Sequence, residues 1–421
     1  MLDVFFEDDR VGRIEHAGPL LSFTYDRGWL GNPDRFAISV TMPLAAETCS
    51  GEVATPWFAN LLPEDRQLET IGRLLGRDPG DVYGLLERMG RDTAGALSIG
   101  GPEPRDAGRY HALDEAALAD AIDRLPRRPL LAGEADITMS LAGAQSKLAV
   151  AVFDGRIHLP LNGAASTHIL KPASQRLYAT VENELLCLRL AAALGLPVAA
   201  AAMARAAGRP YLLVERFDRR IVGGHRVSRS HQEDLCQALG RYPTQKYESG
   251  RGPGLADLFA VLDRHARRPA ADRLALLDLV IFAACIGDSD RHAKNYALML
   301  APGPVRLAPG YDLMTALAYD NVTGNLAMKV AGVSRPEFIE RRHWERFAAR
   351  VGLSQAAILR QVGVIATAVA ARAEAVAREI ARENDASLSV LTLFAERIAR
   401  RADAVLAASR RGPSDRSRQD Q

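Results

Sequence analysis

Cysteine is scarce in this 421-residue sequence, and uninterrupted apolar runs are too short to cross a membrane. The four cysteines lie far apart, which argues against a disulfide framework or zinc site and favours buried thiols in a reducing compartment. The first residues lack the basic and apolar regions of a signal peptide, so we expect a cytoplasmic protein without a membrane segment. Neither charge is in excess, because 53 Lys and Arg oppose 51 Asp and Glu, and so no basic surplus indicates nucleic-acid binding.

The length is sufficient for two to three domains, and strand and helix patterns are unevenly distributed. Asp154 and Gly155 separate two apolar runs, Lys147–Phe153 and Arg156–Leu161, which predicts a tight hairpin. Strand patterns dominate 140–217, whereas helical patterns dominate 228–409. The sequence therefore predicts an α+β fold with a β-rich N-terminal lobe, a helical C-terminal lobe and a ligand cleft between them.

Four parts are expected along the chain. Residues 1–100 form a small α+β unit without residues of catalytic type, for which a packing or docking role is the simplest interpretation. Residues 101–227 form the N-terminal lobe, after a Gly/Pro-rich linker near 100–108. Residues 228–411 form the helical lobe, and residues 412–421 are expected to be disordered because they contain nothing to bury.

The most informative stretch chemically is I-G-D-S-D-R-H-A-K-N, residues 286–295, which follows an apolar segment, Leu274–Ile286, expected to form a helix buried on every face. A short hairpin is expected between Asn295 and Asp312. Asp290, Asn295 and Asp312 have the spacing of a kinase-type phosphoryl-transfer site. Asp290 would accept the proton of the attacking hydroxyl, while the other two would supply hard oxygen ligands to Mg²⁺. The alternative is a solvated loop whose surface ion pairs contribute little.

Three features earlier in the chain bear on the choice between a phosphoryl-transfer site and a solvated loop. Ser140–Lys147 is a small-residue loop that would allow close approach of an anion, although with one glycine it is equally well an ordinary surface loop. Lys171 ends the expected strand Thr167–Pro172, where a kinase keeps its phosphate-binding lysine, but a strand lysine is usually solvated. Glu184, in the first turn of an expected helix over Val181–Leu194, either orients Lys171 or compensates the helix dipole.

The remaining elements complete the expected layout. The strand Tyr211–Phe217 turns polar at its end, as at a hinge that binds adenine through its backbone. Helices are expected over His231–Leu239, Leu255–His265 and Gln355–Arg382. The aromatic side chains expected to anchor the last helical region to the large lobe are Phe338, Trp344 and Phe347. The arginine-rich end is either a solvated face or a contact for an acidic partner or a nucleic-acid backbone.

Several motifs, in order along nearly the whole chain, carry a resemblance to one family. They are N-L-L-P (60–63), G-R-D-T-A-G-A-L (90–97), S-L-A-G-A-Q-S-K (140–147), H-I-L-K-P (168–172), V-E-N-E-L-L-C-L (181–188), V-E-R-F-D-R (214–219), Q-E-D-L-C-Q (232–237), D-R-H-A-K-N (290–295) and L-A-P-G-Y-D (307–312). Together they resemble the HipA-type serine/threonine kinase toxins of bacterial toxin–antitoxin pairs. The chain lacks the H-R-D and D-F-G motifs of protein kinases at large, and its loop is similar to that of phosphoinositide kinases.

The resemblance implies a role for each matching position. Asp290 would be the catalytic base, Asn295 and Asp312 would hold Mg²⁺, and Lys171 would bind the ATP phosphates. Further nucleotide contacts are implied for the phosphate loop, the hinge and the histidine of the catalytic loop: Ala142, Gly143, Ala144, Gln145, Ser146, Lys147, Glu215, Phe217, Asp218 and His292. Asp218 would lie near the ribose. Ser140 would be the autophosphorylation site, with Thr138 as the alternative acceptor.

The resemblance also implies a biological setting. Family members phosphorylate a serine of an aminoacyl-tRNA synthetase, which halts translation and induces dormancy and persistence. A small helix-turn-helix antitoxin, HipB-like, holds them and binds operator DNA with them. Two other functions are compatible with the residues: a phosphoinositide-like or small-molecule kinase, and a non-catalytic co-repressor of the antitoxin.

Overall fold

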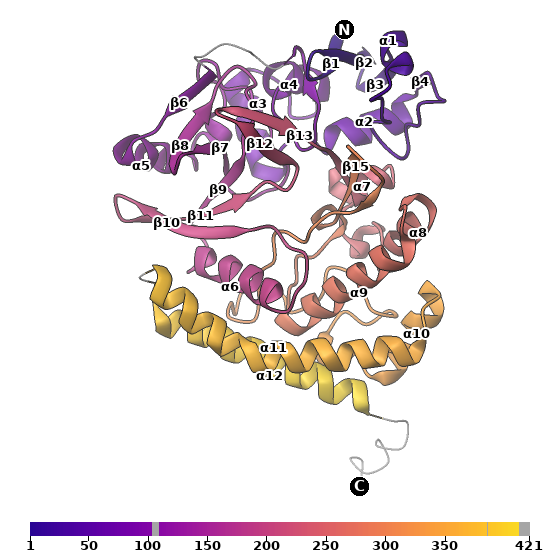
Figure 1. Ribbon diagram of the computed structural model, residues 1–421, viewed down its shortest axis with the longest axis vertical. Coiled ribbons are helices and arrows are strands. Elements are labelled where there is room, and N and C mark those ends of the chain that lie inside the picture. The colour runs from indigo at the N-terminus through magenta and orange to yellow at the C-terminus, as the bar shows by residue number, and fades with distance from the viewer. Residues whose placement is uncertain (103–108, 385, 412–421) are drawn as a thin grey trace. The chain divides into compact units, whose positions relative to one another are not determined.

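The computed structural model describes residues 1–102, 109–384 and 386–411, so the expected tail and most of the expected linker lie outside the described residues. The chain divides into two compact units, strand-rich and helical, which confirms the α+β class (Figure 1). Unit 1 comprises Met1–Gln175, Ala202–Thr244 and Ala297–Ala308; unit 2 comprises Arg176–Ala201, Gln245–Tyr296 and Pro309–Gln421. The expected boundaries near residues 100 and 227 stay predictions.

The first sheet of unit 1 is built almost entirely from the first hundred residues. Its strands pair in the order β4-β3-β2-β1-β5, and the pairing is antiparallel throughout. The strands are β1 (Leu2–Phe6), β2 (Asp9–Ala17), β3 (Leu20–Tyr25), β4 (Thr48–Cys49) and β5 (Ser98–Ile99). The helices of this region are α1 (Arg27–Gly31), α2 (Gly51–Ala59), α3 (Asp65–Leu75) and α4 (Val82–Met89), and α2 packs on β3.

The second sheet of unit 1 carries the expected hairpin. Its strands pair in the order β10-β11-β9-β7-β8-β6. They are β6 (Tyr110–Ala112), β7 (Leu148–Phe153), β8 (Arg156–Pro160), β9 (His168–Pro172), β10 (Ala201–Ala206) and β11 (Arg209–Glu215). Helix α5 (Glu115–Arg124) and the 3₁₀ turn η2 (Pro129–Leu131) precede β7 in the chain. Asp154 and Gly155 both have positive φ, 50° and 73°, as a two-residue turn between β7 and β8 requires. The hairpin is therefore confirmed, and β9 ends close to where the sequence predicts it.

A single hydrophobic core runs through both of these sheets. It includes Val4 and Trp57 from the first hundred residues and Leu131, Leu148 and Leu170 from the following part of the chain. Because these side chains are buried in the same cluster, residues 1–100 contribute to a shared interior.

Two small sheets complete unit 1: the hairpin of β12 (Arg219–Gly223) and β13 (Arg226–Arg229), and the order β14-β15-β16. The hairpin of β15 (Ala297–Ala301) and β16 (Arg306–Leu307) is the one expected between Asn295 and Asp312. The helix expected over His231–Leu239 is wrong in its first half, because β14 (His231–Asp234) pairs with β15 and only α7 (Leu235–Ala238) is helical. Asp234 ends the strand and caps α7 by accepting a hydrogen bond from the N–H of Gln237.

Unit 2 is helical. Its helices are α6 (Thr180–Ala193), α8 (Leu255–His265), α9 (Pro269–Ile286), α10 (Arg341–Val351), α11 (Gln355–Asn384) and α12 (Leu388–Arg410); short 3₁₀ turns are η3 (Pro243–Gln245, at its border with unit 1), η4 (Glu248–Gly250), η5 (Ala293–Asn295) and η6 (Pro336–Phe338). The long helices α11 and α12 lie side by side (Figure 1). Their buried residues recur at spacings of three and four, as near-parallel helix packing requires.

Helix α11 is long and apolar enough to cross a membrane by length and composition, contrary to the expectation that no segment would be. Its buried residues pack against α6, α9, α10 and α12, and a core helix passes the same test of composition.

Burial corrects two further expectations. Leu274 on α9 is 51% exposed, so this helix is buried on every face only from Leu276 onward. Phe338 is 55% exposed and is therefore not a buried anchor, whereas Trp344 and Phe347 are buried as expected. All four cysteines are buried free thiols, as the sequence predicts.

Candidate active site

The predicted site residues are divided between the two units. Unit 2 contains Asp290, His292, Asn295 and Asp312, and unit 1 contains the phosphate loop, Lys171 and the hinge residues.

The loop that carries Asp290 begins at a glycine that no other residue could replace without strain. Gly287 ends α9 with φ of 67°, and an added Cβ would lie 2.6 Å from the side chain of Leu317. The carbonyl oxygen of Gly287 accepts a hydrogen bond of 3.0 Å from the N–H of Ala316. The end of α9 therefore fixes both the loop 288–295 and the segment that follows Asp312.

The main chain of Asp290 is held from both sides while its side chain faces solvent. Its carbonyl oxygen accepts hydrogen bonds of 2.8 Å from the N–H of His292 and from Nδ2 of Asn295, and its N–H donates to Oδ1 of Asp288 at 3.1 Å. The side chain is 67% exposed. A fixed backbone with an accessible carboxylate suits a base that must meet a second substrate.

Arg291 and Tyr311 connect the loop 288–295 to the segment that carries Asp312. The guanidinium of Arg291 donates to the carbonyl oxygen of Tyr311 at 2.5 Å, and the hydroxyl of Tyr311 donates to the carbonyl oxygen of Lys294 at 2.6 Å. Arg291 is 3% exposed, and its guanidinium lies 4.5 Å from the ring centroid of Tyr296. These reciprocal contacts fix Asp312, whose φ is 55°, relative to Asp290 and Asn295.

The pKa of the buried carboxyl group of Asp288 depends on the charges around it. Burial raises the pKa of Asp288 to about 7, against the opposing effect of Arg291, and the negative charges of Asp290 and Asp312 raise it further. One guanidinium and two carboxylates thus act on this buried group. The carboxylate of Asp312 and the amide oxygen of Asn295 are ligand types that fit Mg²⁺. In proteins this ion is usually held by one or two carboxylates together with the phosphates of the substrate.

Lys171 in unit 1 is 7% exposed and lies opposite Leu212 on the neighbouring strand β11. A lysine is rarely buried unless an anionic group compensates its charge. Its expected partner, Glu184, is also buried, on α6 of unit 2, and the pairing of these two residues stays a prediction.

The loop 140–147 is hydrogen-bonded to the N-L-L-P motif and to residues that follow it. Ser140 is fully buried, and its Oγ donates a hydrogen bond of 2.8 Å to the carbonyl oxygen of Leu61. Nε2 of Gln67 donates to the carbonyl oxygen of Ala144 at 2.7 Å. The sequence did not predict this contact, which gives the first hundred residues a direct role in holding the loop.

Gly143 is the turning point of this loop. Its φ of 102° is strained for any other residue, and its carbonyl oxygen accepts a hydrogen bond of 3.3 Å from the N–H of Glu64. The ammonium group of Lys147 folds back and donates to the carbonyl oxygen of Ala142. The backbone is thus shaped by small residues, as a loop that approaches an anion closely must be.

Of the hinge residues, Glu215 is exposed and Phe217 is half-buried, while Asp218 is 1% exposed. The carboxylate of Asp218 pairs with Arg216 and Arg219, each at 2.9 Å, and accepts from the N–H of Gly95 at 2.8 Å. Burial alone would raise the pKa of Asp218, but the two guanidinium groups hold it well below its usual range. These contacts give Asp218 a structural role, and its place near the ribose stays a prediction.

Asp92 belongs to the same buried cluster. Its carboxylate lies 2.9 Å from Arg219 and 3.6 Å from Arg216, and it is 1% exposed. The motifs 90–97 and 214–219 therefore meet in one ion cluster. Their opposite charges were visible in the sequence, but nothing there indicated which charges would pair.

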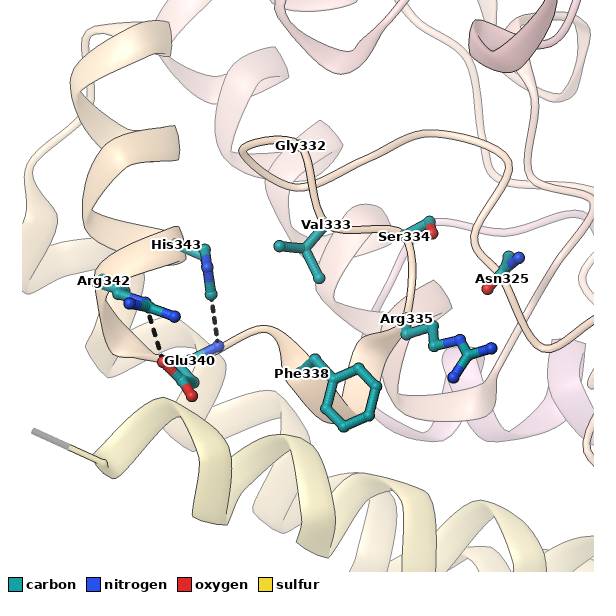
Figure 2. Close-up of a pocket in the computed structure, with 9 residues that line it drawn as sticks. All are labelled: Asn325, Gly332, Val333, Ser334, Arg335, Phe338, Glu340, Arg342 and His343. Carbon is teal, nitrogen blue, oxygen red and sulfur yellow. Dashed lines mark hydrogen bonds and ion pairs between the residues drawn. The ribbon is translucent and has the colours of Figure 1, made fainter. Parts of the chain in front are cut away.

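A surface pocket of about 530 Å³ also lies in unit 2, but none of the predicted site residues lines it (Figure 2). Its lining consists of Asn325, Gly332, Val333, Ser334, Arg335, Phe338, Glu340, Arg342 and His343. Glu340 pairs with Arg342 at 2.9 Å, and its N–H donates to Nδ1 of His343 at 2.9 Å, so these polar groups bind one another. We assign no catalytic role to this pocket.

Comparison with known proteins places the chain in one family. The model of the HipA N-terminal domain matches residues 2–100, and the model of the HipA-like C-terminal domain matches residues 139–382. A putative kinase of Sinorhizobium fredii, Y4mE, is 39% identical over 409 residues and 95% of both chains. The serine/threonine-protein kinase toxin HipA of Shewanella oneidensis is 30% identical over 370 residues, which cover 84% of this chain and 83% of that protein.

A solved structure agrees in fold. The Shewanella oneidensis complex of HipA, HipB and operator DNA matches with a TM-score of 0.82, over 97% of this chain and 99% of that chain, at 24% identity. This likeness confirms the expected two-lobed kinase-like fold. With domain models that cover most of the chain and a HipA toxin that is 30% identical over 84% of it, the chain belongs to the HipA family of kinases.

Proposed function

We propose that this chain is a serine/threonine protein kinase that transfers the γ-phosphoryl group of ATP to a protein serine. The observation that carries the proposal is the accessible carboxylate of Asp290 on a main chain that Asn295 fixes and that Arg291 and Tyr311 link to the segment of Asp312. The curated relative of Shewanella oneidensis is named a serine/threonine-protein kinase toxin, which supports the same reaction.

In the proposed reaction the serine Oγ forms a bond to the γ-phosphorus while the bond to the leaving ADP oxygen breaks. The carboxylate of Asp290 accepts the proton of the serine hydroxyl. When bound, Mg²⁺ neutralises phosphate charge, and Asn295 and Asp312 would hold it. We assign Lys171 and the loop Ala142–Lys147 to the phosphates, and the hinge at Glu215 and Phe217, with His292, to the rest of the nucleotide.

The partners of the relatives suggest partners for this chain. The matching solved structure contains an antitoxin, HipB, and operator DNA. We infer that a helix-turn-helix antitoxin binds this chain, that operator DNA is contacted mainly through the antitoxin, and that the substrate is an aminoacyl-tRNA synthetase of the cytoplasm. Phosphorylation of that enzyme would block translation.

We also propose that phosphorylation of Ser140 switches the kinase off. A phosphate would add about −1.5 to −2 charges to a loop assigned to the triphosphate, so like charges would repel. Ser140 is buried against Leu61, and the loop must leave this contact before the serine can react. Mass spectrometry should find phosphate at Ser140 in inactive protein, with Thr138 as the alternative acceptor. Full occupancy of Ser140 in fully active protein would contradict this role.

The reaction class is tested by supplying labelled ATP and purified protein to a bacterial lysate. Label in a protein band, recovered as phosphoserine, is the expected result. Label in lipid or in small metabolites would instead favour a phosphoinositide-like or small-molecule kinase. Absence of any transfer, together with retained binding of the antitoxin, would favour a non-catalytic co-repressor.

A further inference from the structure

The carboxylate proposed as the base has a neighbour that the sequence motifs do not include. The hydroxyl of Tyr247, 43 positions before Asp290, donates a hydrogen bond of 2.6 Å to its Oδ1. The main chain of Asp290 is fixed, but an aspartate side chain that is 67% exposed could adopt several rotamers. A general base must hold its oxygen within hydrogen-bond reach of the attacking hydroxyl, so its orientation matters for rate.

Tyr247 is itself held by neighbours that are nearly buried. Its ring meets the ring of His292 edge to face, with centroids 4.9 Å apart and planes at 83°. The ammonium nitrogen of Lys246 lies 5.3 Å from the centroid of the tyrosine ring. His292 and Lys246 are 5% and 9% exposed, so the phenol stands on a rigid support.

The backbone of Tyr247 is fixed by a tight turn. Its carbonyl oxygen accepts hydrogen bonds of 3.0 Å from the N–H groups of both Gly250 and Gly252. The turn is so close that a Cβ at Gly252 would lie 2.0 Å from the carbonyl oxygen of Gln245. Only glycine fits there, which indicates that the path of this loop is specified.

The same loop also contacts both segments of the candidate active site. The carbonyl oxygen of Lys246 accepts a hydrogen bond of 3.3 Å from the N–H of Ala293, in the catalytic loop. The carboxylate of Glu248 accepts one of 2.6 Å from the N–H of Lys329, in the segment after Asp312. Tyr247 thus lies between two residues that are hydrogen-bonded to these segments.

We propose that Tyr247 is a positioning residue for phosphoryl transfer: its hydroxyl holds the Asp290 carboxylate in the rotamer that accepts the proton of the substrate serine. This inference rests on the proposed function, because it assigns a role to Asp290 as base. Tyr247 gives up no atom in the reaction. The opposite arrangement, in which the phenol competes with the substrate hydroxyl for Asp290, predicts the opposite change in rate.

The test is Tyr247→Phe, which removes the hydroxyl and keeps the ring against His292. Initial rates of label transfer from ATP into lysate protein, measured over a range of ATP concentrations, give kcat and KM for ATP. We expect kcat to fall about tenfold, as when a hydrogen bond to a charged group is lost, while KM for ATP changes by less than about twofold. The melting temperature should stay unchanged.

The matched control is Tyr178→Phe, which also removes a phenol hydrogen bond in unit 2, that of 3.1 Å to the carbonyl oxygen of Ala318. This variant should keep the kcat of the wild type. A Tyr247→Phe enzyme with unchanged or raised kcat would overturn the inference while leaving the kinase assignment intact. A wild-type protein that transfers no label would instead refute the proposed function, and with it the inference.

Discussion

Asp288 and Asp290 are two residues apart and have opposite environments. The side chain of Asp288 is buried, and burial raises its pKa to about 7, whereas the side chain of Asp290 is 67% exposed and bonded to Tyr247. The carboxyl group of Asp288 accepts a hydrogen bond from the N–H of Asp290 and so supports the loop. The carboxyl group of Asp290 is the one that a substrate can reach. The difference in burial, and not the residue type, separates a structural acid from a candidate base.

The role of Asp312 as a metal ligand can be tested alone. In Asp312→Ala, one carboxylate oxygen donor to Mg²⁺ is lost, so the affinity for Mg²⁺-ATP should fall by at least about tenfold, the lower end of what even outer-shell changes cost at metal sites. Isothermal titration calorimetry with Mg²⁺-ATP measures this directly. Asp320→Ala, an exposed aspartate eight positions later, is the control and should bind normally. Unchanged affinity in Asp312→Ala would count against the metal role.

At the level of single residues, the catalytic and metal-binding roles assigned from the sequence stay predictions. Spacing alone singled out Asp290, Asn295 and Asp312, and the structure holds their segments together in unit 2 through Arg291 and Tyr311. The sequence could not supply the partners of these residues. Arg291 and Tyr311 are 20 positions apart, and contacts between side chains at such separations depend on the path of the whole chain.

At the scale of elements, the sequence predicted those turns and helix ends that depend on one or two neighbouring residues. Asp154 and Gly155 specify the hairpin of β7 and β8, and Gly287 specifies the end of α9. The strand β14 was mistaken for a helix because its identity depends on pairing with β15, more than sixty residues later. Its inward residues, His231 and Glu233, are polar, so no apolar alternation marked it as a strand.

Glu233 on β14 should make stability depend on pH. It is 1% exposed and accepts from the N–H of Val40 at 3.0 Å and from Nε1 of Trp57 at 2.9 Å, and burial raises its pKa from 4.5 to about 7. Between these values the unfolded chain loses its proton while the folded protein keeps it. The free energy of unfolding should therefore fall as pH rises through this window, by about 3 kcal/mol for a shift of about 2.5 units.

Urea unfolding of wild type and Glu233→Gln at a series of pH values isolates this contribution. Glutamine does not titrate, so the stability advantage of wild type over the variant should be largest near pH 4.5 and should shrink toward pH 8. His231, whose pKa burial lowers to about 4, is present in both proteins and cancels in the difference. Parallel stability curves for the two proteins would rule out a titrating Glu233.

The contact between α3 and the loop 140–147 predicts a remote effect on nucleotide binding. Gln67→Ala removes the hydrogen bond to the carbonyl oxygen of Ala144 and loosens the loop, so KM for ATP should rise about fivefold, as expected for one neutral hydrogen bond, with little change in kcat. Steady-state rates at varied ATP measure it. Gln361→Ala, which loses a similar bond of 2.7 Å to Asp278, should show normal KM. Equal KM values for both variants would contradict the assignment of the loop 140–147 to the nucleotide site.

At the scale of the whole molecule, two motifs that are far apart in sequence contribute charged side chains to the buried interior of unit 1. The motif 90–97 and the motif 214–219 meet in a buried cluster of Asp92, Arg216, Asp218 and Arg219. Removing one partner of a buried pair would leave an uncompensated charge in the interior. The first hundred residues, for which the sequence predicted a packing or docking role, contribute Asp92 to this cluster and many side chains to the core of unit 1.

The account as a whole depends on Asp290 acting as the base of a protein kinase, and one comparison tests this most directly. Wild type and Asp290→Ala are given labelled ATP and lysate, and each is titrated with Mg²⁺-ATP in parallel. We predict that the variant binds ATP with wild-type affinity and transfers phosphate about 10²- to 10⁴-fold more slowly. An Asp290→Ala protein that phosphorylates serine at a near-normal rate would contradict the account.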